Sequence, residues 1–324
     1  MQPLLDVREL EVKLSKRRGT TTLVDGVSFC VYPRESFGIV GESGCGKSLS
    51  ALSIMRLISY PLHIGGGEII FGGQNLMMLS KKEMQKVRGR EISMIFQEPM
   101  TSLDPIFTIE NQLIEILQIH FKKMPRNVML EKIHEVLKKV GIAQVERVIA
   151  SYPHQLSGGM LQRVMIAMAM ICEPKLLIAD EPTTALDVTI QAQILSLMND
   201  LKENFSASIV IITHDLGVIA ETCQRVAVLY AGQVVEQATV SDIFSNPLHP
   251  YTKGLLKSVK ALGKRDKKLY SISGMVPSMD SVGAGCRFYE RCEYAGKECL
   301  EPQELYEISP EHICRCVKSK EGKI

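Results

Sequence analysis

The chain has 324 residues, 45% of them apolar and 23% charged, with a formal net charge of +2 at pH 7. This composition excludes a disordered chain, and the near-neutral charge offers no basic face for nucleic acid, so we expect no nucleic-acid partner. The sequence has no run of about 18 apolar residues, so we expect no membrane-spanning helix. Charges interrupt the N-terminal stretch in which a signal peptide needs apolar residues. We therefore expect a cytosolic protein.

A phosphate-binding loop is predicted in the first sixth of the chain. An apolar strand over residues 36–40 leads into GESGCGKS at 41–48, and helical spacing of apolar residues follows over 49–58. Strand, glycine-rich turn and helix form the context in which the pattern G-x-x-x-x-G-K-[ST] binds a nucleotide. The order of these three segments therefore predicts a nucleotide site.

The residues of this loop have separate roles. Lys47 supplies a positive charge to the β- and γ-phosphates, and Ser48 supplies a hydroxyl ligand for Mg²⁺. The helix N-terminus adds its partial positive charge. Backbone N–H groups approach the phosphates where no Cβ stands in the way, at Gly41, Gly44 and Gly46. The other loop positions expected to contact the nucleotide are Ser43, Cys45 and Leu49.

Two amphipathic helices are predicted between residues 99 and 150, in the stretches ENQLIEILQIH and NVMLEKIHEVLKKVG. One face of the second helix carries four apolar residues at helical spacing, Leu130, Ile133, Leu137 and Val140. Periodicity alone leaves two alternatives open. The helices pack only for stability, or they also present a groove to a partner.

A second phosphate cradle is predicted within HQLSGGMLQRVMIAMAM, residues 154–170. Ser157, Gly158 and Gly159 open a helix whose apolar residues are dense enough to be buried. Two separated cradles in one chain suggest a site that another chain completes.

An acidic pair is predicted at the end of a buried strand in KLLIADEP, residues 175–182. Asp180 emerges at the carboxyl end of that strand, where ligands bind in open α/β sheets, and it can hold Mg²⁺ through water. Glu181 projects differently and can orient or deprotonate an attacking water.

These motifs resemble those of the ABC-type ATPases, and the resemblance covers essentially the whole chain. LSGGM is similar to the signature sequence of that family, in which one subunit's signature closes over ATP held on the phosphate loop of its partner. The resemblance implies an α/β fold with a P-loop NTPase core. It places a nucleotide-binding domain at residues 1–235, a helical subdomain at about 99–165, and a small Cys-rich C-terminal extension at 236–324.

The resemblance also assigns further site residues. Gln97 in MIFQEP resembles the Q-loop glutamine, which contacts Mg²⁺ and the attacking water. The sequence Ala185-Leu186-Asp187 resembles the D-loop that crosses the dimer interface. His214 in IITHD resembles the switch histidine that reaches the γ-phosphate. Together with Glu181, the residues Gln97 and His214 are the expected catalytic groups.

One position departs from the family pattern. Leu14 stands where a tyrosine or phenylalanine often stacks on adenine. We therefore expect adenine to rest on aliphatic surface, such as Leu14 and Val24.

Several stretches resemble the importers of oligopeptides, dipeptides and nickel: MIFQEPMTSLDP, LSGGM, DVTIQAQIL and NPLHPYTKGLL at 246–256. The implied function is an ATP-hydrolysing subunit that powers peptide import as its dimer closes and reopens. Nickel or metal–chelate import and a non-transport ABC ATPase remain alternatives. The implied partners are two transmembrane permease subunits, a second related ATPase in a heterodimer, and an extracytoplasmic binding protein. The implied location is peripheral, on the cytoplasmic face of the membrane.

The nine cysteines fall into two sets. Four are scattered and are expected to be small buried hydrophobic residues: Cys30, Cys45, Cys172 and Cys223. Five cluster in the extension, beyond a basic linker at 262–271: Cys286, Cys292, Cys299, Cys314 and Cys316. Because a reducing compartment disfavours disulfides, a metal is the expected staple for so small a segment.

The spacings C-x₅-C-x₆-C fit zinc poorly and suit an iron–sulfur cluster better. GCRFYERC resembles the G-C-x-F-x-x-R-C of the peptide importers, and His312 and Cys316 match their final His-x₃-Cys. The resemblance implies a 4Fe–4S cluster held by Cys286, Cys292, Cys299 and Cys316, with Cys314 spare. Structural zinc, free or regulatory thiols, and Cys314 as the fourth ligand remain open, as does a sensor role for the extension.

Overall fold

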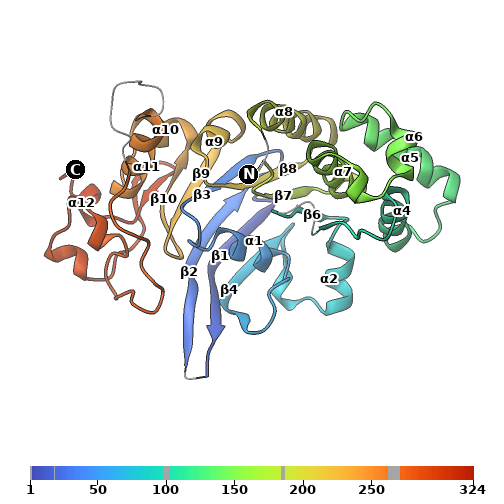
Figure 1. Ribbon diagram of the computed structural model, residues 1–324. Helices are drawn as coiled ribbons and strands as arrows, with labels where there is room; N and C mark the ends of the chain where they lie inside the picture. Colours follow the sequence, from blue (N-terminus) through green and yellow to red (C-terminus); the bar gives the residue numbers. More distant parts are fainter. Residues whose placement is uncertain (1, 18, 98–101, 184–186, 262–270) are drawn as a thin grey trace. The chain divides into compact units, whose positions relative to one another are not determined.

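A computed structural model describes residues 2–17, 19–97, 102–183, 187–261 and 271–324 (Figure 1). Its contacts divide the chain into two compact units, which are described separately. Unit 1 consists of Met1–Tyr32, Ser36–Met77 and Ile212–Ile324, and unit 2 of Pro33–Glu35 and Met78–Ile211. Ala185 and Leu186 of the predicted D-loop, and residues 262–270 of the predicted linker, lie outside the described residues.

The first sheet of unit 1 is antiparallel, in the order β2-β1-β4-β5 (Figure 1). Its strands are β1 (Leu5–Ser15), β2 (Thr20–Val31), β4 (Leu62–Phe71) and β5 (Gln74–Asn75). Burial along β1 alternates over Leu5 and Val7, then changes phase to Leu10 and Val12. A register shift between Val7 and Leu10 and a φ of +46° at Glu9 cause this change, as expected of a bulge that keeps apolar residues facing the core.

The second run of strands in unit 1 has the order β11-β12-β10-β9-β3. It contains β3 (Ser36–Val40), β9 (Arg225–Tyr230), β10 (Gln233–Thr239), β11 (Tyr306–Ser309) and β12 (His312–Cys314). β3 pairs parallel with β9, and β10 pairs antiparallel with both β9 and β12. The extension thus adds two strands next to β10, which itself crosses the predicted boundary at residue 235.

The helices of unit 1 are α1 (Lys47–Ile54), α9 (Leu216–Thr222), α10 (Val240–Ser245), α11 (Pro250–Ala261) and α12 (Val317–Lys320). Two 3₁₀ turns lie in the extension, at Tyr289–Arg291 and Lys297–Leu300. Phe288 is 3% exposed and belongs to the same apolar cluster as Tyr230 and Tyr251. The extension therefore shares the core of unit 1 and does not pack as a small unit by itself. Sequence periodicity missed this because the contacts are far apart in the chain.

A buried carboxylate links the extension to β10. Glu236 is fully buried and accepts hydrogen bonds from the N–H groups of Leu248 and His249, at 2.7 and 2.9 Å. Its Oε1 also lies 2.8 Å from Nε2 of His312 on β12. A buried carboxylate is tolerated only where its oxygens are paired in this way.

Unit 2 contains the parallel pair β6 (Ile92–Ile95) and β7 (Leu176–Asp180). The next neighbour of β7 is β8 (Ser208–Thr213), of which Ser208–Ile211 belong to unit 2. Its helices are α2 (Lys81–Val87), α4 (Ile109–His120), α5 (Arg126–Lys139), α6 (Val145–Ala150), α7 (Gly158–Met170) and α8 (Val188–Phe205). Short 3₁₀ turns occur at Leu76–Met78 and Pro153–Gln155. The α/β class is confirmed.

The two predicted amphipathic helices are confirmed as α4 and α5. On α5, Ile133 and Leu137 are buried as expected and Leu130 is half-buried, and Val140, which caps the end of the helix, is also buried. None of the helices in the described ranges is both long and apolar enough to cross a bilayer.

Candidate functional site

The predicted phosphate-binding loop connects the fully buried strand β3 to helix α1. A Cβ at Gly41 would lie 2.2 Å from the carbonyl oxygen of Leu229, so only glycine fits there. Gly44 and Gly46 have φ values of +78° and +101°, in the region that glycine adopts without strain. The loop therefore has the backbone geometry that a cradle for phosphate oxygens requires.

The Lys47 side chain is folded back over this loop. Its Nζ donates to the carbonyl oxygens of Gly41 and Glu42, at 2.7 and 3.1 Å, and the residue is only 5% exposed. Ser48 and Leu49 are half-buried, and Ser43 is exposed. Cys45 is fully buried, which raises the pKa of its thiol, so its side chain packs beneath the loop. Cys45 can therefore contact a nucleotide only through its backbone atoms.

The predicted acidic pair lies at the end of β7, as expected. Asp180 is 4% exposed, and Glu181 follows it with a φ of +48°. A non-glycine residue in that conformation costs on the order of 1–3 kcal/mol and is typical of functional sites. The sequence gives no sign of this strain.

Gln97 and Glu181 meet at the carboxyl ends of β6 and β7. The strands are parallel, with Ile95 opposite Ala179, so the residues that follow each strand lie on the same edge. Nε2 of Gln97 donates to Oε2 of Glu181 at 3.1 Å. An amide and a carboxylate in contact can together orient one water molecule.

Gln162 is a further residue of this region, which the sequence patterns did not single out. It lies on α7, is 3% exposed, and donates through Nε2 to the carbonyl oxygen of Pro182 at 2.6 Å. It thereby fixes the turn that follows Glu181. The sequence signal that could have identified it is a glutamine within an otherwise apolar helical stretch.

Ser157 is the N-cap of α7, and its Oγ accepts from the N–H of Met160 at 3.4 Å. Ser157 and Gly158 are exposed, and a Cβ added at Gly158 would meet no atom within 4 Å. Gly159 is half-buried against Ile190. The signature segment thus presents the exposed N-terminus of a 13-residue helix. The free N–H groups and partial positive charge of a helix N-terminus favour anion binding.

Asp187 and His214 each lie at the start of a helical segment. Asp187 caps α8 by accepting from the N–H of Ile190 at 3.0 Å. His214 is exposed directly after β8, and the next residue, Asp215, caps α9. The phosphate loop, His214 and the predicted adenine contacts belong to unit 1. The predicted residues of the Q-loop, the signature, the acidic pair and the D-loop that the structure describes belong to unit 2.

The adenine expectation is only partly consistent with the structure. Leu14 is half-buried on β1, but Val24 is fully buried. A Cβ at Gly46 would lie 3.1 Å from Cγ2 of Val24, so this valine packs under the loop. The expectation that Val24 offers exposed surface to adenine is wrong.

Four of the five clustered cysteines line one pocket in unit 1: Cys286, Cys292, Cys299 and Cys316. Cys314 is fully buried on β12 and does not line it. Burial raises the pKa of Cys286 to about 12, and the neighbouring thiols contribute to the shift. Across the described ranges, no three His, Cys, Asp or Glu side chains converge to hold one metal ion. The predicted metal site, whether a 4Fe–4S cluster or structural zinc, is thus unsupported by the described residues.

Of the scattered cysteines, Cys45 and Cys172 are buried as expected, whereas Cys30 and Cys223 are half-buried. Burial raises the pKa of Cys172 to about 11, so it remains a neutral thiol.

Comparison with known families gives two matches. The family described as "ABC transporter" matches residues 24–184. The family described as "Oligopeptide/dipeptide transporter, C-terminal region" matches residues 235–299.

Similar proteins match over nearly the full chain. The "Probable peptide ABC transporter ATP-binding protein y4tR" of Sinorhizobium fredii is 53% identical over 98% of this chain and 96% of its own length. The "Dipeptide transport ATP-binding protein DppD" of Bacillus subtilis is 50% identical over 90% of this chain and 87% of its own. A solved structure, "Dimeric structure of a post-hydrolysis state of the ATP-binding cassette MJ0796 bound to ADP and Pi", has a TM-score of 0.66 and 26% identity. It covers 73% of this chain and 98% of that one.

Proposed function

The chain belongs to the ABC transporter family, among the ATP-binding subunits of peptide importers, and from this premise we propose that it hydrolyses ATP to power the import of di- or oligopeptides. The observation that carries the proposal is the loop at 41–48, where close backbone approach and a buried lysine form a phosphate cradle. Peptide rather than nickel import is favoured because the relatives named above are peptide transport proteins.

The nucleotide chemistry follows from the residues of each unit. Lys47 and the loop N–H groups hold the phosphates, and the Ser48 hydroxyl at the start of α1 is a ligand for Mg²⁺, which neutralises phosphate charge when bound. Asp180, at the end of β7, would help to hold the ion. Gln97 and Glu181 orient the attacking water, with Glu181 accepting its proton and His214 acting at the γ-phosphate.

The test of this function is reconstitution. The purified chain, combined with its permeases, its second ATPase and its binding protein in lipid vesicles, is expected to hydrolyse ATP faster when peptide is present and to accumulate that peptide inside. Stimulation by a nickel chelate but not by peptide would support the alternative substrate. Hydrolysis that responds to neither would contradict transport.

The exposed signature segment and the open loop support a nucleotide held between two chains. The solved relative described as dimeric and bound to ADP and phosphate is consistent with this arrangement. We propose that the second chain is a different ATPase of the same family, and that the pair lies peripherally on the cytoplasmic face of the membrane. Copurification of two distinct ATPase chains in equal amounts would support the heterodimer.

The permease docking surface is proposed on unit 2. A groove of about 920 Å³ there is lined by apolar and basic side chains, including Ile119, Phe121 and Lys122. Ile119 is 58% exposed, and Ile106 and Phe107 nearby in the sequence are also exposed. Exposed apolar groups rimmed by charge are typical of protein–protein interfaces.

Ile119→Glu is expected to prevent assembly with the permeases while leaving the basal ATPase rate unchanged. A charge in the centre of an apolar contact typically weakens binding by about 30-fold or more. Copurification of tagged permease measures this. Val128→Glu is the matched control, because Val128 lies on α5 and does not line the groove. The Val128 variant should assemble with the permeases normally. Normal assembly of the Ile119 variant would remove this surface from the interface.

We further propose that the pocket lined by four thiols holds a 4Fe–4S cluster. The support for this proposal is that four cysteines line one pocket, which is the number of thiolate ligands that a 4Fe–4S cluster takes. The cluster would be held by Cys286, Cys292, Cys299 and Cys316 and would cross-link the extension. Binding would release the thiol protons, because the ligands of a cluster are thiolates.

Anaerobically purified protein is expected to be brown and to contain iron and acid-labile sulfide. Cys316→Ala should lose both, because it removes one ligand of the pocket. Cys314→Ala is the matched control, since Cys314 is buried two residues away but does not line the pocket, and it should keep both. Colourless wild-type protein with one tightly bound zinc would refute the cluster.

A further inference from the structure

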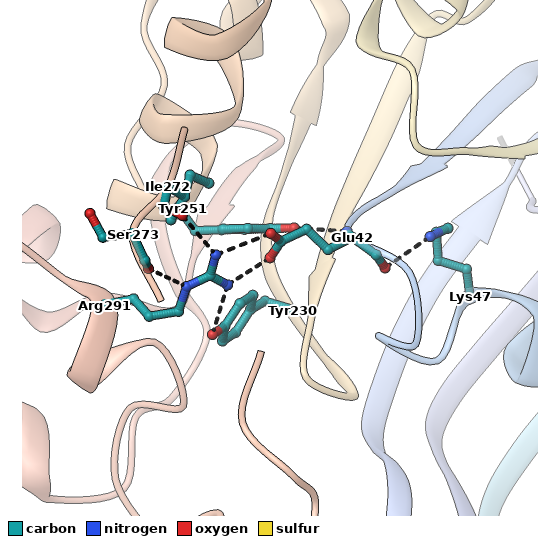
Figure 2. A network of polar contacts seen from close by, with 7 residues as sticks. All are labelled: Glu42, Lys47, Tyr230, Tyr251, Ile272, Ser273 and Arg291. Atoms are coloured by element: carbon teal, nitrogen blue, oxygen red, sulfur yellow. Dashed lines mark hydrogen bonds and ion pairs between the residues drawn. The ribbon is translucent and has the colours of Figure 1, made fainter. Parts of the chain in front are cut away.

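The Cys-rich extension contacts the phosphate-binding loop through Arg291 (Figure 2). The Arg291 guanidinium binds the Glu42 carboxylate with two bonds, Nη1 to Oε2 at 2.7 Å and Nη2 to Oε1 at 3.1 Å. Glu42 is the second residue of the loop, 249 positions earlier in the chain. The Arg291 side chain is only 5% exposed, whereas the Glu42 side chain is 30% exposed, so water reaches this pair mainly through the carboxylate. Two-bond arginine–carboxylate pairs are stronger and more directional than single contacts.

Arg291 itself has little freedom to move. Its Nε donates to the carbonyl oxygen of Ser273 at 2.9 Å, and Nη1 lies 3.3 Å from the hydroxyl of Tyr230. Its guanidinium also lies over the rings of Tyr230 and Phe288, at 5.7 and 5.8 Å from their centres. The carboxylate of Glu42 is therefore held by a group that is already fixed in place.

The backbone of Glu42 is held as well (Figure 2). Its N–H donates to the hydroxyl of Tyr251 at 2.9 Å, and its carbonyl accepts from Nζ of Lys47 at 3.1 Å. Tyr251 is fully buried on α11. One residue of the loop thus joins the extension to the lysine that binds phosphate.

A second arginine of the same segment, Arg287, contacts the turn between β9 and β10. Arg287 donates to the carbonyl oxygen of Ala231 at 2.5 Å and forms an ion pair with Asp25. The next residue, Gly232, donates its N–H to the carbonyl oxygen of Cys45 in the loop at 3.0 Å. Both arginines of GCRFYERC therefore support the loop, one directly and one through the β9–β10 turn.

The position of Arg291 in the extension is also informative. It ends the 3₁₀ turn Tyr289–Arg291, which lies between Cys286 and Cys292. Both of these cysteines line the four-thiol pocket. Any change that displaces this short segment would displace the guanidinium that holds Glu42.

We propose that Arg291 is a positioning residue for nucleotide binding, which keeps the phosphate-binding loop in its binding-competent conformation and makes the Cys-rich extension a working part of the ATP site. The proposal rests on ATP binding in the proposed function. A loop that is already ordered avoids the entropy cost of ordering on binding, so loss of the contact weakens affinity. At saturating ATP the bound phosphates order the loop themselves.

The test is a comparison of Arg291→Gln with the wild-type full-length chain. We expect the KM for ATP, and the Kd for magnesium-ATP measured by calorimetry, to rise by roughly tenfold, while kcat stays within about twofold. Glu42→Gln, which removes the other partner and leaves the extension intact, should give a similar rise. The double variant should be little worse than either single variant, because one interaction is lost in all three. Arg291→Lys keeps the charge without the two-bond geometry and should recover part of the affinity.

Lys257→Gln is the matched control. It removes one positive charge from the same extension and breaks a surface ion pair with Glu293, which does not contact the loop. Its KM should equal that of the wild type. The proposal would be overturned if Arg291→Gln left KM unchanged and lowered kcat only in proportion to the fraction of folded protein. That result would show that Arg291 has a purely structural role. Wild-type protein that binds no magnesium-ATP would instead contradict the proposed function.

Discussion

Glu181→Gln is expected to lower kcat for ATP hydrolysis by about 10²–10⁴-fold, because a glutamine cannot accept the proton of the attacking water. ATP affinity should be nearly unchanged, since the phosphate loop and Lys47 are intact. The variant should also accumulate as a closed dimer in the presence of ATP, because closure needs ATP binding and reopening needs hydrolysis. Steady-state phosphate release and size-exclusion chromatography with ATP measure the two effects.

The structure sharpens this expectation through Gln97. Glutamine at position 181 can still make a hydrogen bond with Gln97, so the local geometry at the ends of β6 and β7 is preserved. A loss of rate therefore reports the missing proton acceptor rather than a displaced turn. Glu203→Gln, at an exposed position near the end of α8, removes the same charge and should keep the wild-type rate. Near-normal turnover of Glu181→Gln would exclude Glu181 as the general base.

Glu236→Ala is expected to reduce the stability of unit 1 by several kcal/mol, because each buried hydrogen-bonding group left without its partner costs about 1–3 kcal/mol. The change would leave the N–H groups of Leu248 and His249 and the ring of His312 without their acceptor. Burial already lowers the pKa of His249 to about 4, so this ring is neutral near pH 7 and cannot form a compensating ion pair.

Urea denaturation followed by tyrosine fluorescence measures the loss, since the chain has no tryptophan and Tyr230 and Tyr251 lie in the same core. Glu236→Gln keeps one oxygen acceptor and should be less destabilising. Glu321→Ala breaks only the exposed ion pair with Lys323 and should leave the midpoint unchanged. An unfolding midpoint for Glu236→Ala equal to that of the wild type would show that the extension is held in place by other contacts.

The sequence determined the local parts of this protein. The loop at 41–48 is contiguous, so its strand, glycines, lysine and helix are fixed by neighbouring residues and could be predicted directly. The same holds for Ser157 at the start of α7 and for the acidic pair at the end of β7. The amphipathic pattern of α4 and α5 likewise depends only on helical spacing.

Contacts between distant residues were decided by the tertiary structure. The parallel register of β6 and β7 brings Gln97 to Glu181, and the pairing of β12 with β10 places the extension in the core of unit 1. Val24 lies beneath Gly46 for the same reason, although its sequence neighbourhood suggested exposed surface. A local pattern shows which face of a strand is apolar, but it does not show which strand of a distant segment pairs with it.

Arg291 illustrates the difference most clearly. From the sequence, GCRFYERC was a group of cysteines separated by polar and aromatic residues, and its arginines had no assigned partners. Only the folded chain brings one of them to Glu42, because a bond across 249 residues requires that the strands and helices between them are already packed. The sequence determined which chemical groups the protein has, and the packing decided which of them act on one another.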